Sequence, residues 1–290
     1  IIVGKRAQIV DAVACLLARK NQAEGRAGGF FEAALALEQA LALGAERCAT
    51  HLYLASVYRE TGRALEALRM ASRALDLAEG QAEEGEARFE AGCAANGLLR
   101  KGQGNEEQRA GWLQAALENL AEAARLQPGN PQAWIYLSNS HAWAGGIREE
   151  LKALRKGLRR CPRSEALHAY TQDRLFALGL YEEAAGILRG LIAEAPENSA
   201  ALWYLGRARL ALAEELRRDE EPERALQAYQ EALPLWKEAA RREPSFGPAS
   251  ARAAAMALVG EASLRIDRKE PERAEADRKS TRLNSSHRIR

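Results

Sequence analysis

Histidine and cysteine side chains are the ones best suited to acid–base catalysis and metal binding, and this sequence of 290 residues holds four of each. The histidines are His51, His141, His168 and His287. The cysteines are Cys15, Cys48, Cys93 and Cys161. No histidine belongs to an H-E-x-x-H motif, and no two cysteines form the C-x-x-C pair that zinc sites use. We therefore expect these residues to pack between helices, and we predict no metal site.

Carboxylates are numerous, but their positions are typical of solvated helix surfaces. The pairs Glu149-Glu150 and Glu182-Glu183 fall where helices should begin, and there they favour the positive end of the helix dipole. Gly102 and Gly104 are spaced as in a phosphate-binding loop, but the Gly-Lys-Ser/Thr ending of such a loop is missing. We predict no catalytic residues and no cofactor, and hence a binding protein rather than an enzyme.

The elements that carry these residues recur along the chain. Pro128, Pro162 and Pro196 lie 34 residues apart, twice over. Other positions keep the same step: Trp134, His168 and Leu202; Leu120, Leu154 and Leu188; Gly145 and Gly179. A large residue early in the repeat, glycine in the middle, alanine after it and proline at the end is typical of tetratricopeptide repeats. The sequence resembles that family over most of its length.

The resemblance implies an all-α fold, a right-handed superhelical solenoid of antiparallel helix pairs. The composition agrees, because the 47% hydrophobic content is dominated by alanine and leucine, which favour helices. No apolar stretch is long enough to span a membrane, so we expect no membrane insertion.

The repeat register divides residues 1–276 into seven units, the last of them truncated. Their approximate bounds are 1–45, 48–81, 82–130, 131–164, 165–198, 199–247 and 248–276. The third unit is expected to hold a helix from Phe89 to Arg100, a polar insertion from Lys101 to Gln108 and a second helix from Trp112. The sixth unit exceeds the period by 14 residues, and longer helices meeting around Arg218–Pro222 should absorb the excess.

Residues 277–290 differ abruptly in composition from the rest of the chain. The string from Asp277 to His287 resembles the translation of a common sequencing adapter, and we expect a non-native, disordered tail. Glu270-Pro271 repeats the start of an earlier helix, so the array should break off as a new helix begins. Without the tail, the net charge changes from +2 to −2, with 37 basic and 39 acidic residues. We therefore expect no nucleic-acid partner.

In the family, the first helix of each pair lines a concave groove, and the register assigns residues of this sequence to it. The candidate partner-binding residues are Leu52, Ser56, Arg59, Gln132, Ile135, Asn139, Trp143, Asp173, Trp203 and Arg207. Tryptophan and arginine are the types that most often carry binding energy. Trp143 and Trp203 could equally pack between units. The lysines with which some family members hold a partner's terminal carboxylate are missing, so a carboxylate-clamp co-chaperone is not expected.

The leading functional hypothesis is a protein-interaction scaffold that binds a protein or peptide partner, as a peptide or helix in this groove. The alternative is a regulatory or substrate-recognition arm of a larger enzyme (a glycosyltransferase, sulfotransferase or kinase) whose catalytic domain lies outside this sequence. The truncated last unit should expose apolar surface around Met256, Leu258 and Val259 and could mediate self-association. The compartment stays open, with a weak preference for the cytoplasm. The chain begins at Ile1, so an upstream signal peptide remains compatible with it.

Overall fold

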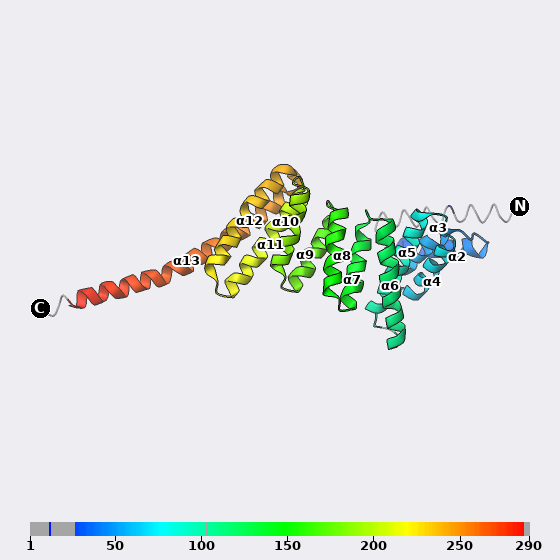
Figure 1. Ribbon diagram of the computed structural model, residues 1–290, viewed down its shortest axis with the longest axis horizontal. Helices are drawn as coiled ribbons and strands as arrows, with labels where there is room; N and C mark the ends of the chain where they lie inside the picture. The colour runs from blue at the N-terminus through cyan, green and yellow to red at the C-terminus, as the bar shows by residue number, and fades with distance from the viewer. Residues whose placement is uncertain (1–11, 13–26, 103, 287–290) are drawn as a thin grey trace. The chain divides into compact units, whose positions relative to one another are not determined.

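The computed structural model describes residue 12, residues 27–102 and residues 104–286, and these form helices without a strand. Cys15 and His287 lie outside the described residues. The chain divides into two compact units, residues 1–161 and residues 162–290. Within each unit, helices that follow one another lie side by side and run antiparallel (Figure 1).

Unit 1 contains α2 and three helix pairs, in each of which a short turn connects a first helix to a second. The helices are α2 (Ala27–Ala42), α3 (Cys48–Glu60), α4 (Ala64–Asp76), α5 (Gln81–Arg100), α6 (Glu106–Leu126), α7 (Pro131–Trp143) and α8 (Ile147–Arg160). Alanines at the contacts allow the helices to approach closely. Ala55, Ala71 and Ala91, for example, form one buried cluster shared by α3, α4 and α5.

Unit 2 contains two helix pairs and a long last helix. The elements are α9 (Glu165–Ala177), α10 (Tyr181–Glu194), α11 (Ser199–Arg218), α12 (Pro222–Arg242), the short 3₁₀ turn η1 (Pro244–Phe246) and α13 (Gly247–Ser286). The core of α11, α12 and α13 surrounds Tyr229 and Trp236, which are almost fully buried. As predicted, α11 and α12 are long and meet around Arg218–Pro222.

Local sequence signals explain where the helices begin and end. Asn130 accepts a hydrogen bond from the Gln132 N–H at 3.0 Å, and Pro131 occupies the first helical position of α7. Between α7 and α8 the chain turns at Gly145, whose φ of +73° is strained for other residues. The turn between α11 and α12 achieves the same reversal with Glu220 at φ +60°.

The third repeat departs from prediction at both of its helices. Helix α5 begins at Gln81 rather than Phe89, and α6 begins at Glu106, inside the expected polar insertion. The start of α6 is fixed by a capping box: Asn105 Oδ1 accepts from the Gln108 N–H at 2.9 Å, and Gln108 Oε1 accepts from the Asn105 N–H at 3.0 Å. The extra residues therefore lengthen two helices instead of forming a loop.

The C-terminal segment also differs from expectation. Helix α13 continues as one helix through Pro271 and through residues 277–286, where a new helix and then a disordered tail were expected. Residues 261–276 are rich in alanine, glutamate and arginine, which favour a helix, whereas residues 277–286 contain neither alanine nor glutamate. The adapter origin of Asp277–His287 stays a prediction. Met256, Leu258 and Val259 are more than half exposed, which confirms the predicted apolar face of α13.

Candidate functional site

The inner face of unit 1 is formed by the first helices of its three pairs, α3, α5 and α7, and holds two hollows. The larger, here called the basic hollow, has a cavity volume of about 490 Å³. Its polar and aromatic lining residues are Arg59, Glu60, Asn96, Arg100, Lys101, Tyr136, Asn139 and Trp143, and Glu60 is the one carboxylate among them. The smaller, here called the acidic hollow, has a volume of about 390 Å³. It is lined mainly by Leu52, Ser56, Glu83, Glu86, Phe89 and Glu90.

An ion pair joins the two hollows, because Arg59 lines one and Glu90 lines the other. The Arg59 Nε lies 2.9 Å from Glu90 Oε2, and a second guanidinium nitrogen donates to Oε1 at 3.4 Å. A further nitrogen of Arg59 lies 2.7 Å from the Glu60 carboxylate. Burial raises the pKa of Glu90, against the opposing effect of the Arg59 guanidinium. The two hollows differ in charge, since Glu83, Glu86 and Glu90 line one, whereas three cations and the single carboxylate of Glu60 line the other.

The wall of the basic hollow is held by hydrogen bonds between helices. Asn96 donates from Nδ2 to the Tyr136 carbonyl at 3.1 Å, and its Oδ1 accepts from Ser140 Oγ at 3.2 Å. Lys101 Nζ donates to the Gly62 carbonyl and so ties the end of α5 to the turn after α3. Trp143, by contrast, is 45% exposed at the end of α7. The hollow thus combines a rigid polar wall with an accessible aromatic ring.

The structure brings together three of the residues that the sequence assigned to a groove. Arg59, Asn139 and Trp143 all line the basic hollow. Leu52 and Ser56 line the acidic hollow but are mostly buried.

Two other candidates on α7 line neither hollow. Ile135 is 8% exposed and Gln132 is exposed. The four candidate residues on α7 therefore do not form one surface: Gln132 faces solvent, Ile135 lies in the core, and Asn139 and Trp143 line the basic hollow.

The remaining candidates lie in unit 2. Trp203 stacks on Phe246 with ring centroids 5.8 Å apart, and the Arg207 guanidinium lies 5.4 Å from the centroid of the indole ring. The ring also meets Tyr204 edge-on at 4.9 Å. Trp203 therefore packs against its neighbours, which is one of the two roles that the sequence allowed for it. Asp173, the remaining candidate, is exposed on α9.

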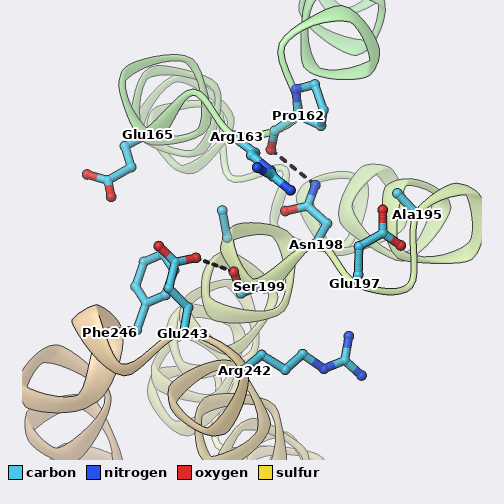
Figure 2. Close-up of a pocket in the computed structure, with 11 residues that line it drawn as sticks. Pro162, Arg163, Glu165, Ala195, Glu197, Asn198, Ser199, Arg242, Glu243 and Phe246 are labelled. Carbon is cyan, nitrogen blue, oxygen red and sulfur yellow. Dashed lines mark hydrogen bonds between the residues drawn. The ribbon is translucent and has the colours of Figure 1, made fainter.

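Unit 2 has a hollow of about 400 Å³ where the α10–α11 connection meets the end of α12. Figure 2 shows the hydrogen bonds that join Asn198 to Pro162 and Ser199 to Glu243 among its lining residues. Asn198 donates to the Pro162 carbonyl at 3.1 Å, Ser199 Oγ donates to Glu243, and Arg242 donates to the Pro196 carbonyl. These contacts hold successive repeats together, so we regard this hollow as a structural junction.

Two histidines and the cysteines of the described residues are buried, whereas His141 is half-buried. His168 is 1% exposed, and its Nε2 lies 2.9 Å from the Pro162 carbonyl. His51 is also buried, with Nε2 at 3.1 Å from Glu46 Oε2. Cys48 and Cys93 are buried free thiols whose pKa values burial raises, that of Cys48 to about 11. High thiol pKa values suppress the thiolate form that reacts with electrophiles or binds metals.

Among the side chains that the structure describes, no group of three or more His, Cys, Asp or Glu is arranged to hold a metal ion. Within residues 27–102 and 104–286, no helix is long and apolar enough to cross a bilayer.

Sequence reasoning missed the contribution of α5, which lies between α3 and α7 and supplies Glu83, Glu86, Glu90, Asn96 and Arg100 to the two hollows. The misplaced start of this helix excluded only Glu83 and Glu86, and the other three residues lay inside the predicted helix but were not assigned to the groove. A signal was present, because Glu83, Glu86, Glu90, Cys93 and Gly97 follow one another at spacings of three and four residues.

Comparison with known proteins supports the fold assignment. No protein-family model and no curated protein matches the sequence. Among solved structures, the C-terminal part of a TPR repeat-containing protein from Cytophaga hutchinsonii is 13% identical, with a TM-score of 0.51 over 88% of this chain and 95% of that one. A thermophilic TPR protein from Thermus thermophilus is 19% identical, with a TM-score of 0.50 over 70% of this chain and 98% of that one. The chain therefore has the tetratricopeptide-repeat fold, as the 34-residue spacing predicted.

Proposed function

We propose that this chain is a protein-interaction scaffold that binds a peptide or helix of its partner along the inner face of α3, α5 and α7. The observation that carries the proposal is the basic hollow, in which three helices converge on the half-exposed Trp143. A concave surface with one accessible aromatic ring and a few fixed polar groups is the usual form of a binding site. Trp143 would provide the apolar anchor, and Asn139 a side-chain amide able to bond a peptide backbone.

The polarity of the inner face favours one direction of binding. A segment lying along it would place basic groups toward Glu83 and Glu86 and acidic groups toward Arg100 and Lys101. The Arg59–Glu90 pair, already satisfied, would lie beneath the middle of the segment. Electrostatic complementarity of this kind fixes register more than it adds affinity.

The test is selection of peptides from a random display library on the intact chain, followed by titration of a selected peptide. Trp143→Ala and Asn139→Ala should each weaken binding, by roughly tenfold for the tryptophan. Phe31→Ala is the matched control, because Phe31 is an exposed aromatic residue (74%) on α2, away from both hollows. Unchanged affinity in both inner-face variants would exclude this surface as the binding site.

A further inference from the structure

The outer surface of unit 1 carries an uneven distribution of charge that the groove does not explain. Helix α8 holds six basic side chains against two acidic ones, a net charge of +4. The other second helices of the unit are neutral or acidic, with a net charge of 0 for α4 and −2 for α6. Glu150, one of the two acids on α8, is fully buried, so only Glu149 offsets the exposed cations.

These cations are aligned along the helix. Arg148, Lys152, Arg155 and Arg159 are spaced by four, three and four residues, which places them on one face, and Lys156 and Arg160 lie beside them. All six are exposed. Together they form a basic ridge about 18 Å long on α8, the second helix of its pair. No α8 residue lines either hollow of the inner face.

Among the described residues, three of the six ridge cations lack the carboxylate pairing found on other helices. Arg125 pairs with Glu122 on α6 at 2.6 Å, and Arg88 pairs with Glu84 on α5 at 2.9 Å. Within the part of the chain that the structure describes, Arg148, Lys152 and Arg155 have no carboxylate partner. Like charges three or four residues apart on a helix destabilise it. A bound polyanion would offset this repulsion.

The surroundings of the ridge indicate which polyanion fits. The apolar residues of α8, such as Leu154 and Leu158, are buried, and only Ile147 in its first turn is exposed, so the helix has no apolar face to enter a bilayer. The ridge has no aromatic residue on which a base could stack. Arginine binds carboxylates in a bidentate manner, and Arg148 and Arg155 both lie on the ridge. An acidic peptide segment therefore matches the chemistry of these side chains.

We propose that the basic ridge of α8 is a second docking surface, which binds an acidic, Asp/Glu-rich segment of a protein. It lies apart from the peptide-binding groove proposed above and does not depend on it. The chain would then be bivalent, with the inner face of α3, α5 and α7 binding one segment and the ridge binding another. Because the attraction is between exposed charges, it should weaken as salt screens it.

The test measures fluorescence anisotropy of a labelled oligoglutamate peptide with the full chain. Lys152→Glu/Arg155→Glu should weaken binding by roughly tenfold or more, because it removes two attractions and adds two repulsions. The control, Arg69→Glu/Arg109→Glu, makes the same change of net charge at exposed positions on α4 and α6 and should leave binding unchanged. Trp143→Ala should also leave it unchanged, which separates this proposal from the groove.

Several results would overturn the proposal. These are no binding of oligoglutamate, equal weakening by the ridge variant and the control, or tighter binding of duplex RNA or phosphatidylserine vesicles than of oligoglutamate at the same salt. The charge reversal should not lower the melting temperature, since it replaces like-charged neighbours by opposite ones. If it nevertheless unfolds the chain, Lys152→Gln/Arg155→Gln gives the same comparison, with weaker binding supporting the ridge and unchanged binding refuting it.

Discussion

Replacing Gly206 by alanine tests how closely two helices of unit 2 approach each other. Gly206 lies in the interior of α11, against the almost fully buried ring of Trp236 on α12. A Cβ atom at Gly206 would lie 2.5 Å from the indole Nε1 and 2.7 Å from Cε2. Both distances are about 1 Å shorter than an ordinary van der Waals contact. The ring would therefore have to move, and with it the hydrogen bond that Nε1 donates to the Trp203 carbonyl at 3.1 Å.

The expected magnitude follows from three opposing effects. Alanine favours a helix interior over glycine by about 1 kcal/mol. Overpacking a core costs about 1–3 kcal/mol, and loss of the indole hydrogen bond costs about 0.5–1.5 kcal/mol. The two costs exceed the gain, so Gly206→Ala should lower the free energy of unfolding by about 1–3 kcal/mol.

The matched control is Gly186→Ala on α10. Gly186 is an exposed helical glycine, and a Cβ there would have no atom within 4 Å. The substitution should raise the free energy of unfolding by about 0.5–1 kcal/mol. The assay is urea unfolding followed by far-UV circular dichroism, with near-UV dichroism to report the environment of Trp236. The reasoning is refuted if Gly206→Ala is as stable as the wild type, or if both variants change stability in the same direction.

Two further predictions concern the cores of the two units. Leu137→Ala should cost about 2–5 kcal/mol in urea unfolding, because Leu137 is 6% exposed; a loss below about 0.5 kcal/mol would contradict its placement. His168 has a lowered pKa because of burial, against the opposing hydrogen bond to the Pro162 carbonyl. As the pH decreases below about 6.5, the imidazole of His168 is protonated in the unfolded chain before it is protonated in the folded chain. The free energy of unfolding should therefore decrease over this range. Half-buried His141 acts in the same direction, and His168→Phe should reduce the pH slope without abolishing it. An unchanged slope would show that His168 is readily protonated in the folded state.

Regular repeats made most of the fold predictable. Prolines at fixed intervals and glycines at the turns identify helix pairs directly, because each has a backbone conformation that few positions tolerate. The long sixth repeat was also predicted, since Pro222 can begin a helix but interrupts one from within. Long helices therefore had to meet just before it.

The third repeat was misread at the start of its first helix. Gly85 lies in the part of α5 that the prediction left out, and glycine is unfavourable inside a helix, whereas Gly92 lay inside the predicted helix. A Cβ on Gly92 would lie 2.4 Å from Leu120 Cγ, and one on Gly85 would lie 2.8 Å from Gln127 Cγ. These glycines are present because α6 packs directly against the α5 backbone. Such a contact joins residues far apart in sequence, and no local pattern reports it.

The candidate site was predictable only in part, for a related reason. Helical spacing finds the side of α7 that bears Ile135, Asn139 and Trp143, but it cannot separate a residue facing the hollow from one facing a neighbouring helix. That difference depends on the crossing of α5 and α7, which Asn96 helps to fix. On α5, Glu83 and Glu86 precede the predicted start of the helix. Glu90, Asn96 and Arg100 lay inside the predicted helix, but the register did not assign them to the groove.

The amide of Asn96 has a counterpart in unit 2, and together they limit how interchangeable the repeats can be. Gln172 on α9 donates from Nε2 to the Tyr204 carbonyl on α11 at 2.7 Å, as Asn96 on α5 does to the Tyr136 carbonyl on α7. Each bond links a side chain of one repeat to the backbone of the next. The two side chains differ in length, because glutamine has one methylene group more than asparagine. A repeat deleted, duplicated or moved within the array would leave a buried amide or carbonyl without its partner. Protein engineers who recombine repeats from this chain should therefore transfer neighbouring pairs together.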